Sequence, residues 1–202
     1  MRPMRRDFGL GGPAAGGFEQ RRVTVLFSEV VDLPLLAASL DPEELNDVVQ
    51  RYYQIFARAN ARFDGCVASL STDGTLAIFG YPNAHEDDAE RALLAAQGLL
   101  NERLLLNPNK RLHMRVGVAT GVVGIGAPIV GAKSPEISVV GEAPNLAARL
   151  QSVAEPDTIL IASGTRRLLG DLFELEPTEP MALKGFDELV IAWRVKRHKG
   201  SR

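Results

Sequence analysis

The sequence is poor in cysteine, in long apolar runs and in excess charge of either sign. Cys66 is the single cysteine of the 202 residues, which excludes an intrachain disulfide and is typical of a reducing compartment. No apolar run reaches the roughly 18 to 20 residues that span a bilayer, and the Arg-rich start lacks the apolar core of a signal peptide. The net charge of -2, without a Lys/Arg block before the last few residues, argues against a nucleic-acid surface. We therefore expect a soluble, cytoplasmic protein that binds neither nucleic acid nor membrane.

The composition that remains is that of one globular domain. Hydrophobic residues make up 46% and charged residues 24%, and the length suits a single core. Residues 1–20 carry Gly, Pro and Arg without periodicity, which predicts a flexible lead-in. We expect the domain over residues 21–196, followed by a solvated basic tail at 197–202.

Strand-like and helix-like segments alternate along the domain without a strict βαβ period, and a hairpin is expected at Asp73-Gly74. We expect strands at 23–27, 67–70, 76–79, 114–119, 137–140, 158–161 and 191–195, helices at about 41–63, 85–106, 142–153 and 164–169, and a Gly-rich connection at 121–133. This pattern predicts an α+β sandwich in which helices cover a mixed central sheet.

Six short motifs occur in order along the domain. They are VLFSEVV (25–31), TDGTLAIFG (72–80), AHEDDAERA (84–92), RVGVATG (115–121), VGEAPNLAARL (140–150) and LKGF (183–186). Each is weak alone, but the ordered set resembles the catalytic domain of class III adenylate/guanylate cyclases. The resemblance implies a ferredoxin-like α+β sandwich that works as a head-to-tail homodimer on a nucleoside triphosphate.

The resemblance also implies a two-metal reaction, in which the ribose 3′ oxygen attacks the α-phosphate and pyrophosphate leaves. By position the metal ligands fall on Glu29 and Asp73, with the carbonyl of Val30 as a further ligand. Oxygen ligands of this kind suit Mg²⁺ or Mn²⁺, two ions per site. Glu29 stands where the family usually has Asp, and its extra methylene moves the carboxylate by roughly 1.5 Å, so we expect Mn²⁺ dependence or low activity. Asp32 either shares the metal or is an ordinary loop acid.

Asn145 and Arg149 match the pair with which the family orients the ribose and stabilises the pentavalent phosphate. Their spacing of four places both on one helix face, and the forked donors of Arg suit phosphate oxygens. In the family the partner subunit supplies this pair. Lys184 resembles the lysine that holds the terminal phosphates, although an ordinary loop lysine is equally compatible with its position.

The positions that read the base depart most from the family. The usual lysine, four residues before the second metal acid, is Ser69, and the Asp or Thr of adenylate cyclases is Ser138. A serine hydroxyl donates or accepts, so these residues do not specify adenine. Side chains on the helices could read a smaller base instead. The candidates are Arg51, Tyr52, Tyr53 and Gln97, with Tyr52 and Tyr53 equally explained as core and dimer-surface residues.

Three hypotheses about activity stay open. The first, which we favour, is a cyclase that acts on UTP or CTP, similar to the free-standing uridylate and cytidylate cyclases of antiphage signalling. The second is an adenylate cyclase that makes cAMP from ATP. The third is a catalytically weak or inactive cyclase-homology module that binds nucleotide or a partner, because Glu29, Ser69 and Pro144 all depart from the family.

Two further segments have simpler interpretations than catalysis. The acids and histidine at 85–88 suit the first turn of a helix better than a metal cluster. The Gly-rich stretch 117–131 lacks the Gly-Lys-Ser/Thr ending of a P-loop, so we interpret it as a flexible arm that contacts the second subunit of a dimer.

Overall fold

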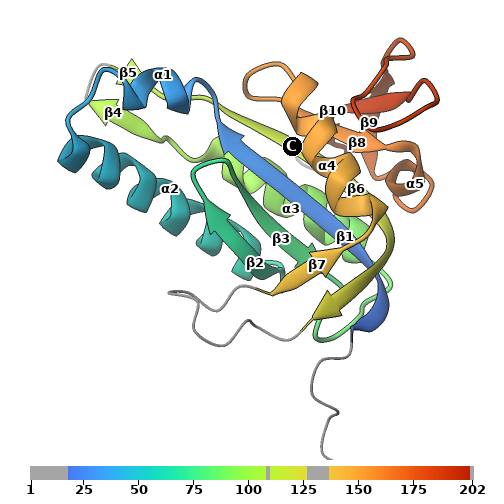
Figure 1. Ribbon diagram of the computed structural model, residues 1–202. Coiled ribbons are helices and arrows are strands. Elements are labelled where there is room, and N and C mark those ends of the chain that lie inside the picture. The colour runs from blue at the N-terminus through green and yellow to red at the C-terminus, as the bar shows by residue number, and fades with distance from the viewer. Residues whose placement is uncertain (1–17, 108–109, 127–136, 201–202) are drawn as a thin grey trace, which may run out of the picture.

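The computed structural model describes residues 18–107, 110–126 and 137–200 (Figure 1). Its helices are α1 (Leu33–Ala37), α2 (Pro42–Ala61), α3 (Asp88–Asn101), α4 (Glu142–Val153) and α5 (Ser163–Arg166). Its strands are β1 (Glu19–Val30), β2 (Cys66–Ser71), β3 (Gly74–Phe79), β4 (Leu105–Asn107), β5 (Lys110–Arg111), β6 (Met114–Gly126), β7 (Ser138–Val140), β8 (Ile159–Ala162), β9 (Phe173–Pro177) and β10 (Ala192–His198).

One mixed sheet forms the centre of the described structure. Its strand order is β2-β3-β1-β6-β8-β10-β9, and β7 pairs with β6 off this path. The pair β6–β8 is parallel and the other pairs of this sheet are antiparallel. The predicted α+β sandwich with a mixed central sheet is confirmed.

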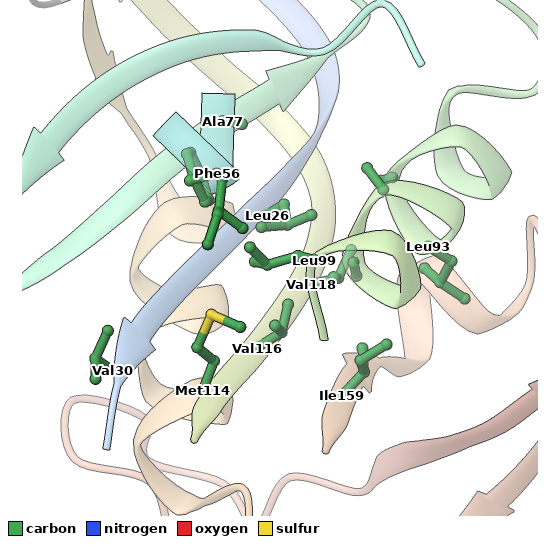
Figure 2. Close-up of a cluster of buried hydrophobic side chains, with 14 of the residues drawn as sticks. Leu26, Val30, Phe56, Ala77, Leu93, Leu99, Met114, Val116, Val118 and Ile159 are labelled. Carbon is green, nitrogen blue, oxygen red and sulfur yellow. The ribbon is translucent and has the colours of Figure 1, made fainter. Parts of the chain in front are cut away.

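Helices cover both faces of this sheet. Helices α2 and α3 pack on one face, where Leu26, Val116 and Val118 of the strands meet side chains such as Phe56 and Leu99 (Figure 2). Helix α4 packs on the opposite face, over a second core. The strand members of that core include Val23, Val25, Ala119 and Val123. Because side chains alternate along a strand, β1 serves both cores at once.

Helix α2 starts and ends as its sequence predicts. The Asp41 side chain accepts hydrogen bonds from the backbone N–H of Glu43 and Glu44, at 3.0 and 2.8 Å, and Pro42 occupies the first turn. The buried face of the helix includes Tyr52 and Phe56. A capped, amphipathic helix of this kind holds one layer of the sandwich in place.

Two expected segments differ in the structure. Helix α3 ends at Asn101 rather than near residue 106, and Leu105 and Asn107 belong to the short strand β4. The expected Gly-rich connection and dimer arm are wrong for residues 117–126, which belong to β6 and pair with β1, while residues 127–136 lie outside the described part. The physical reason is that β1 extends back to Glu19 and pairs with this segment as far as Ile125. Within it, Gly117 lies under α4, where an added Cβ would overlap the carbonyl of Ala147. Glycine serves here as the smallest strand residue.

Both ends of the domain contain more secondary structure than the sequence predicts. Strand β1 begins at Glu19, and residues 1–17 lie outside the described part. The unexpected strand β9 pairs with β10, which continues to His198, and Arg197 donates a 2.6 Å hydrogen bond to Glu174. No helix in the described ranges has the length and apolar character needed to cross a membrane.

Candidate functional site

The ends of β1 and β3 bring the two predicted metal acids together. These strands are antiparallel and pair Ser28 with Thr75. One residue further along, Glu29 therefore lies beside Gly74, the neighbour of Asp73. Asp73 is exposed in the two-residue turn that joins β2 to β3, and the Glu29 side chain is 31% exposed. Both carboxylates thus occupy the same end of the sheet, as the sequence predicts.

Gly74 allows the hairpin to close at this point. Its φ of +143° is a conformation that favours glycine, and an added Cβ would overlap the Phe27 ring. Strand β3 starts at Gly74, so the loop consists of Thr72 and Asp73. The backbone therefore sets where Asp73 lies relative to β1.

A buried set of hydroxyl groups lies beneath the acids. The Tyr52 hydroxyl is 3.1 Å from Ser28 Oγ and 2.8 Å from Thr75 Oγ1, and Thr75 Oγ1 donates to the Ser28 carbonyl at 3.2 Å. Burial raises the pKa of Tyr52 well above its ordinary value, and the charge of Glu29 adds to the rise. The Tyr52 side chain is buried and its hydroxyl already contacts Ser28 and Thr75, so Tyr52 is a core residue and not a base-reading candidate. The sequence analysis gave Ser28 no role, because its partners Tyr52 and Thr75 lie on elements distant in the sequence.

Arg115 is a residue of this site to which the sequence analysis assigned no role. It pairs with Glu29 across β1 and β6, and its Nη1 atom is 4.0 Å from Glu29 Oε1. The same atom donates a 3.3 Å hydrogen bond to the carbonyl of Ser152 at the end of α4. The sequence feature that could have pointed to Arg115 is its place in the RVGVATG motif, two residues before Gly117.

Asn145 and Arg149 lie on the exposed face of α4. The opposite face buries Ala147 and Leu150 against the sheet. No side-chain hydrogen bond or ion pair is recorded for Asn145 or Arg149 within the described ranges. Their amide and guanidinium groups are therefore available to a group outside the described chain, one helical turn apart.

Ser69 and Ser138 lie close together although they are far apart in the sequence. Ser69 is in β2 and Ser138 is the first residue of β7. The backbone N–H of Ile137 donates a 3.0 Å hydrogen bond to the carbonyl of Ala68, which joins their immediate neighbours, and Figure 1 shows β2 and β7 side by side. Both serines are half-buried. One chain thus supplies both of the predicted base-reading positions.

The remaining candidates for reading the base or binding the phosphates do not lie together in the described structure. Arg51 donates to the Asp47 carbonyl at 3.2 Å on α2, and Gln97 lines a separate cavity of about 320 Å³ beside β10. Burial raises the pKa of Tyr53, and the charge of Asp73 adds to the rise, so Tyr53 lies within the influence of a predicted metal acid. Lys184 is exposed in the loop before β10, next to Leu183 of the α4 core.

The model of the adenylate and guanylate cyclase catalytic domain family matches residues 18–196. The chain belongs to this family. It is 27% identical over 185 residues to human atrial natriuretic peptide receptor 2, covering 88% of this chain and 18% of the receptor. The adenylyl cyclase CyaB from P. aeruginosa has a TM-score of 0.81 at 25% identity, over 92% of this chain and 97% of CyaB. The chain thus spans about a fifth of the length of the curated relatives that it matches.

A second solved cyclase domain is similar to this chain in fold. The guanylate cyclase domain of RhGC from Catenaria anguillulae, in complex with GTP, has a TM-score of 0.80 at 20% identity, over 90% of this chain and all of the other. The predicted membership of the class III cyclases is confirmed.

The acid end of this cyclase domain has the donor chemistry that a hard divalent cation requires. Glu29 and Asp73 offer carboxylate oxygens, and the carbonyl of Val30 lies at the end of the same strand. No cluster of three or more Asp, Glu, His or Cys side chains suited to a metal occurs in the part of the chain that the structure describes. Two carboxylates leave most positions to water and phosphate, as is usual for Mg²⁺ beside a triphosphate. The residues therefore fit Mg²⁺ or Mn²⁺.

Proposed function

We propose that the chain is a nucleotide cyclase that converts a nucleoside triphosphate to a 3′,5′-cyclic monophosphate and pyrophosphate, at sites shared by two copies. One observation carries the proposal. The chain presents an acid half, Glu29 and Asp73, at one end of the sheet, and a helix half, Asn145 and Arg149, exposed on α4. A head-to-tail dimer would let the helix half of one copy face the acid half of the other.

Each residue has a role in this proposal. Glu29, Asp73 and the Val30 carbonyl would hold two Mg²⁺ or Mn²⁺ ions, which supply a lowered pKa for the 3′ hydroxyl and charge neutralisation for the phosphates. Asn145 orients the ribose, and Arg149 donates hydrogen bonds to the α-phosphate oxygens as charge builds on them. Lys184 binds the terminal phosphates as a compact cation.

We favour a pyrimidine triphosphate, UTP or CTP, as the substrate, with ATP as the alternative. Ser69 and Ser138 lie together in one chain, and their short hydroxyls leave room that a lysine and an aspartate would fill. Tyr53 is a larger candidate side chain near this site, since the charge of Asp73 adds to burial in raising its pKa. A weak or inactive binding module is the second candidate function, because Glu29, Ser69 and Pro144 all depart from the family pattern.

Substrate choice is tested by incubating the purified chain with each of the four ribonucleoside triphosphates and Mn²⁺. We expect a cyclic product from UTP or CTP, identified by mass spectrometry. Product from ATP alone would exclude the pyrimidine assignment. Absence of product from all four at high protein concentration would exclude the enzyme and favour the binding module.

Site sharing is tested by mixing two inactive variants, Asp73→Ala and Arg149→Ala. Each loses a different half, so a mixed dimer retains one complete site. Random exchange should restore roughly a quarter of the wild-type rate. Each variant alone, at the same total concentration, is the control. No rescue, with dimers demonstrated by sedimentation, would contradict a shared site.

A further inference from the structure

Arg115 connects the two halves that one chain contributes. Its Nη1 atom is 4.0 Å from Glu29 Oε1 and donates a 3.3 Å hydrogen bond to the Ser152 carbonyl in the last turn of α4. The Ser152 hydroxyl donates in turn to the carbonyl of Arg149, at 2.8 Å. A single guanidinium therefore contacts both the strand with a metal acid and the helix with Asn145 and Arg149.

The surroundings of this guanidinium shield most of the Arg115 side chain from solvent. The Arg115 side chain is 24% exposed, and its Nε atom is buried without a hydrogen-bond partner among the described residues. Helix α4 contacts β6 directly at Gly117, where an added Cβ would overlap the Ala147 carbonyl. The backbones of β6 and α4 are thus in close contact two residues from Arg115, within a tightly packed interface.

We propose that Arg115 is a positioning residue that couples the two active sites of the dimer. It orients Glu29 for one site and holds the end of α4, with Arg149, for the other. The inference rests on the proposed function, because the halves of one chain belong to different sites only when two copies exchange them. The link itself lies within one chain and exists without metal or substrate.

Amide hydrogen exchange on the metal-free full chain tests the link without any activity. In Arg115→Gln we expect exchange about fivefold faster in two segments, residues 29–31 and 151–154. The control is Arg194→Gln, which removes a guanidinium of similar exposure, 32%, that pairs with Glu155 just beyond α4 at 3.3 Å. The control should leave residues 29–31 unchanged. Unchanged protection in either segment of Arg115→Gln overturns the coupling.

Mixed dimers show which site each contact serves. In a mixed dimer of Asp73→Ala and Arg149→Ala, one complete site survives. The Arg149→Ala chain supplies the acid half of that site, and the Asp73→Ala chain supplies its helix half. Adding Arg115→Gln to the acid-half chain should lower kcat about tenfold, and adding it to the helix-half chain about threefold. A loss in one arm alone would mean that Arg115 serves one site and would overturn the proposal. If the parent mixture is inactive, the shared site fails instead, and the exchange experiment still decides the role of Arg115.

Discussion

The acid half rests on polar contacts inside its own chain, whereas the helix half has no recorded side-chain partner among the described residues. Beneath the acids, Tyr52 contacts the hydroxyls of Ser28 and Thr75. Asn145 and Arg149 instead project from α4, whose support comes from apolar packing on the opposite face. Changes in the helix half should therefore affect catalysis without affecting stability, and changes beneath the acids should affect stability first.

Replacement of Arg149 by Ala should have the largest effect. Loss of its forked donors removes charge stabilisation from the transition state, and we expect kcat to fall by about 10²- to 10³-fold. Because the residue is exposed, the melting temperature should stay within the error of the wild-type value. Steady-state kinetics and thermal denaturation on the same preparation check both statements. A large drop in melting temperature would show that the helix half is structural.

Gly117→Ala should have the largest effect on stability, because it disrupts the close contact between α4 and β6. Its Cβ would overlap the Ala147 carbonyl and lie 2.6 Å from the Gln151 nitrogen, so α4 must move away from β6. We expect a loss of about 1–3 kcal/mol in the free energy of unfolding, measured by urea denaturation.

The matched control for this change is Gly98→Ala in α3. An added Cβ there meets nothing within 4 Å. Alanine is the better helix former, so the control should gain about 0.5–1 kcal/mol. A similar loss in both variants would contradict the close strand–helix contact.

Tyr52→Phe should have a smaller effect, confined to the support of the acid half. The change leaves the hydroxyls of Ser28 and Thr75 buried with fewer partners, at a cost of about 1–2 kcal/mol in the free energy of unfolding. The control is Tyr53→Phe, since no hydroxyl hydrogen bond of Tyr53 is recorded in the described ranges, and its effect should stay within about 0.5 kcal/mol. Equal effects would mean that the buried hydroxyl network does not support this end of the sheet.

Local patterns predicted the parts of this site that depend on neighbours in the sequence. The Asp-Gly signal placed Asp73 at a hairpin, and the helical spacing placed Asn145 and Arg149 on one face, although strand β3 itself starts at Gly74. Features that depend on distant residues were missed. Strand β6 continues through a Gly-rich segment because residues as far as Ile125 pair with β1, a partner that single-sequence propensity does not contain. The contacts of Arg115 with Glu29 and Ser152 depend on strand register and on helix packing in the same way.

The smallest effect should come from Arg91, which joins surface acids at the end of β2 and β3 away from the Asp73 turn. Its guanidinium donates 2.7 Å hydrogen bonds to Asp87 and to Asp64, beyond the end of α2. The hydrogen bond and charge of Arg91 lower the pKa of Asp87, so the folded chain binds this proton more weakly than the unfolded chain does. The stabilisation is therefore present above the ordinary pKa of Asp and is lost as the pH falls through the lowered value.

In Arg91→Gln we expect the pKa of Asp87 to rise towards its ordinary value, measured by NMR titration of the carboxyl carbon. The stability difference from wild type should shrink as the pH is lowered and as salt is added, because exposed ion pairs are screened. The control is Arg58→Gln, which breaks another surface pair, with Glu102 at 3.6 Å, and should leave the Asp87 titration unchanged. A stability difference that persists at low pH would show that Arg91 acts through packing of its aliphatic stem and not through its charge.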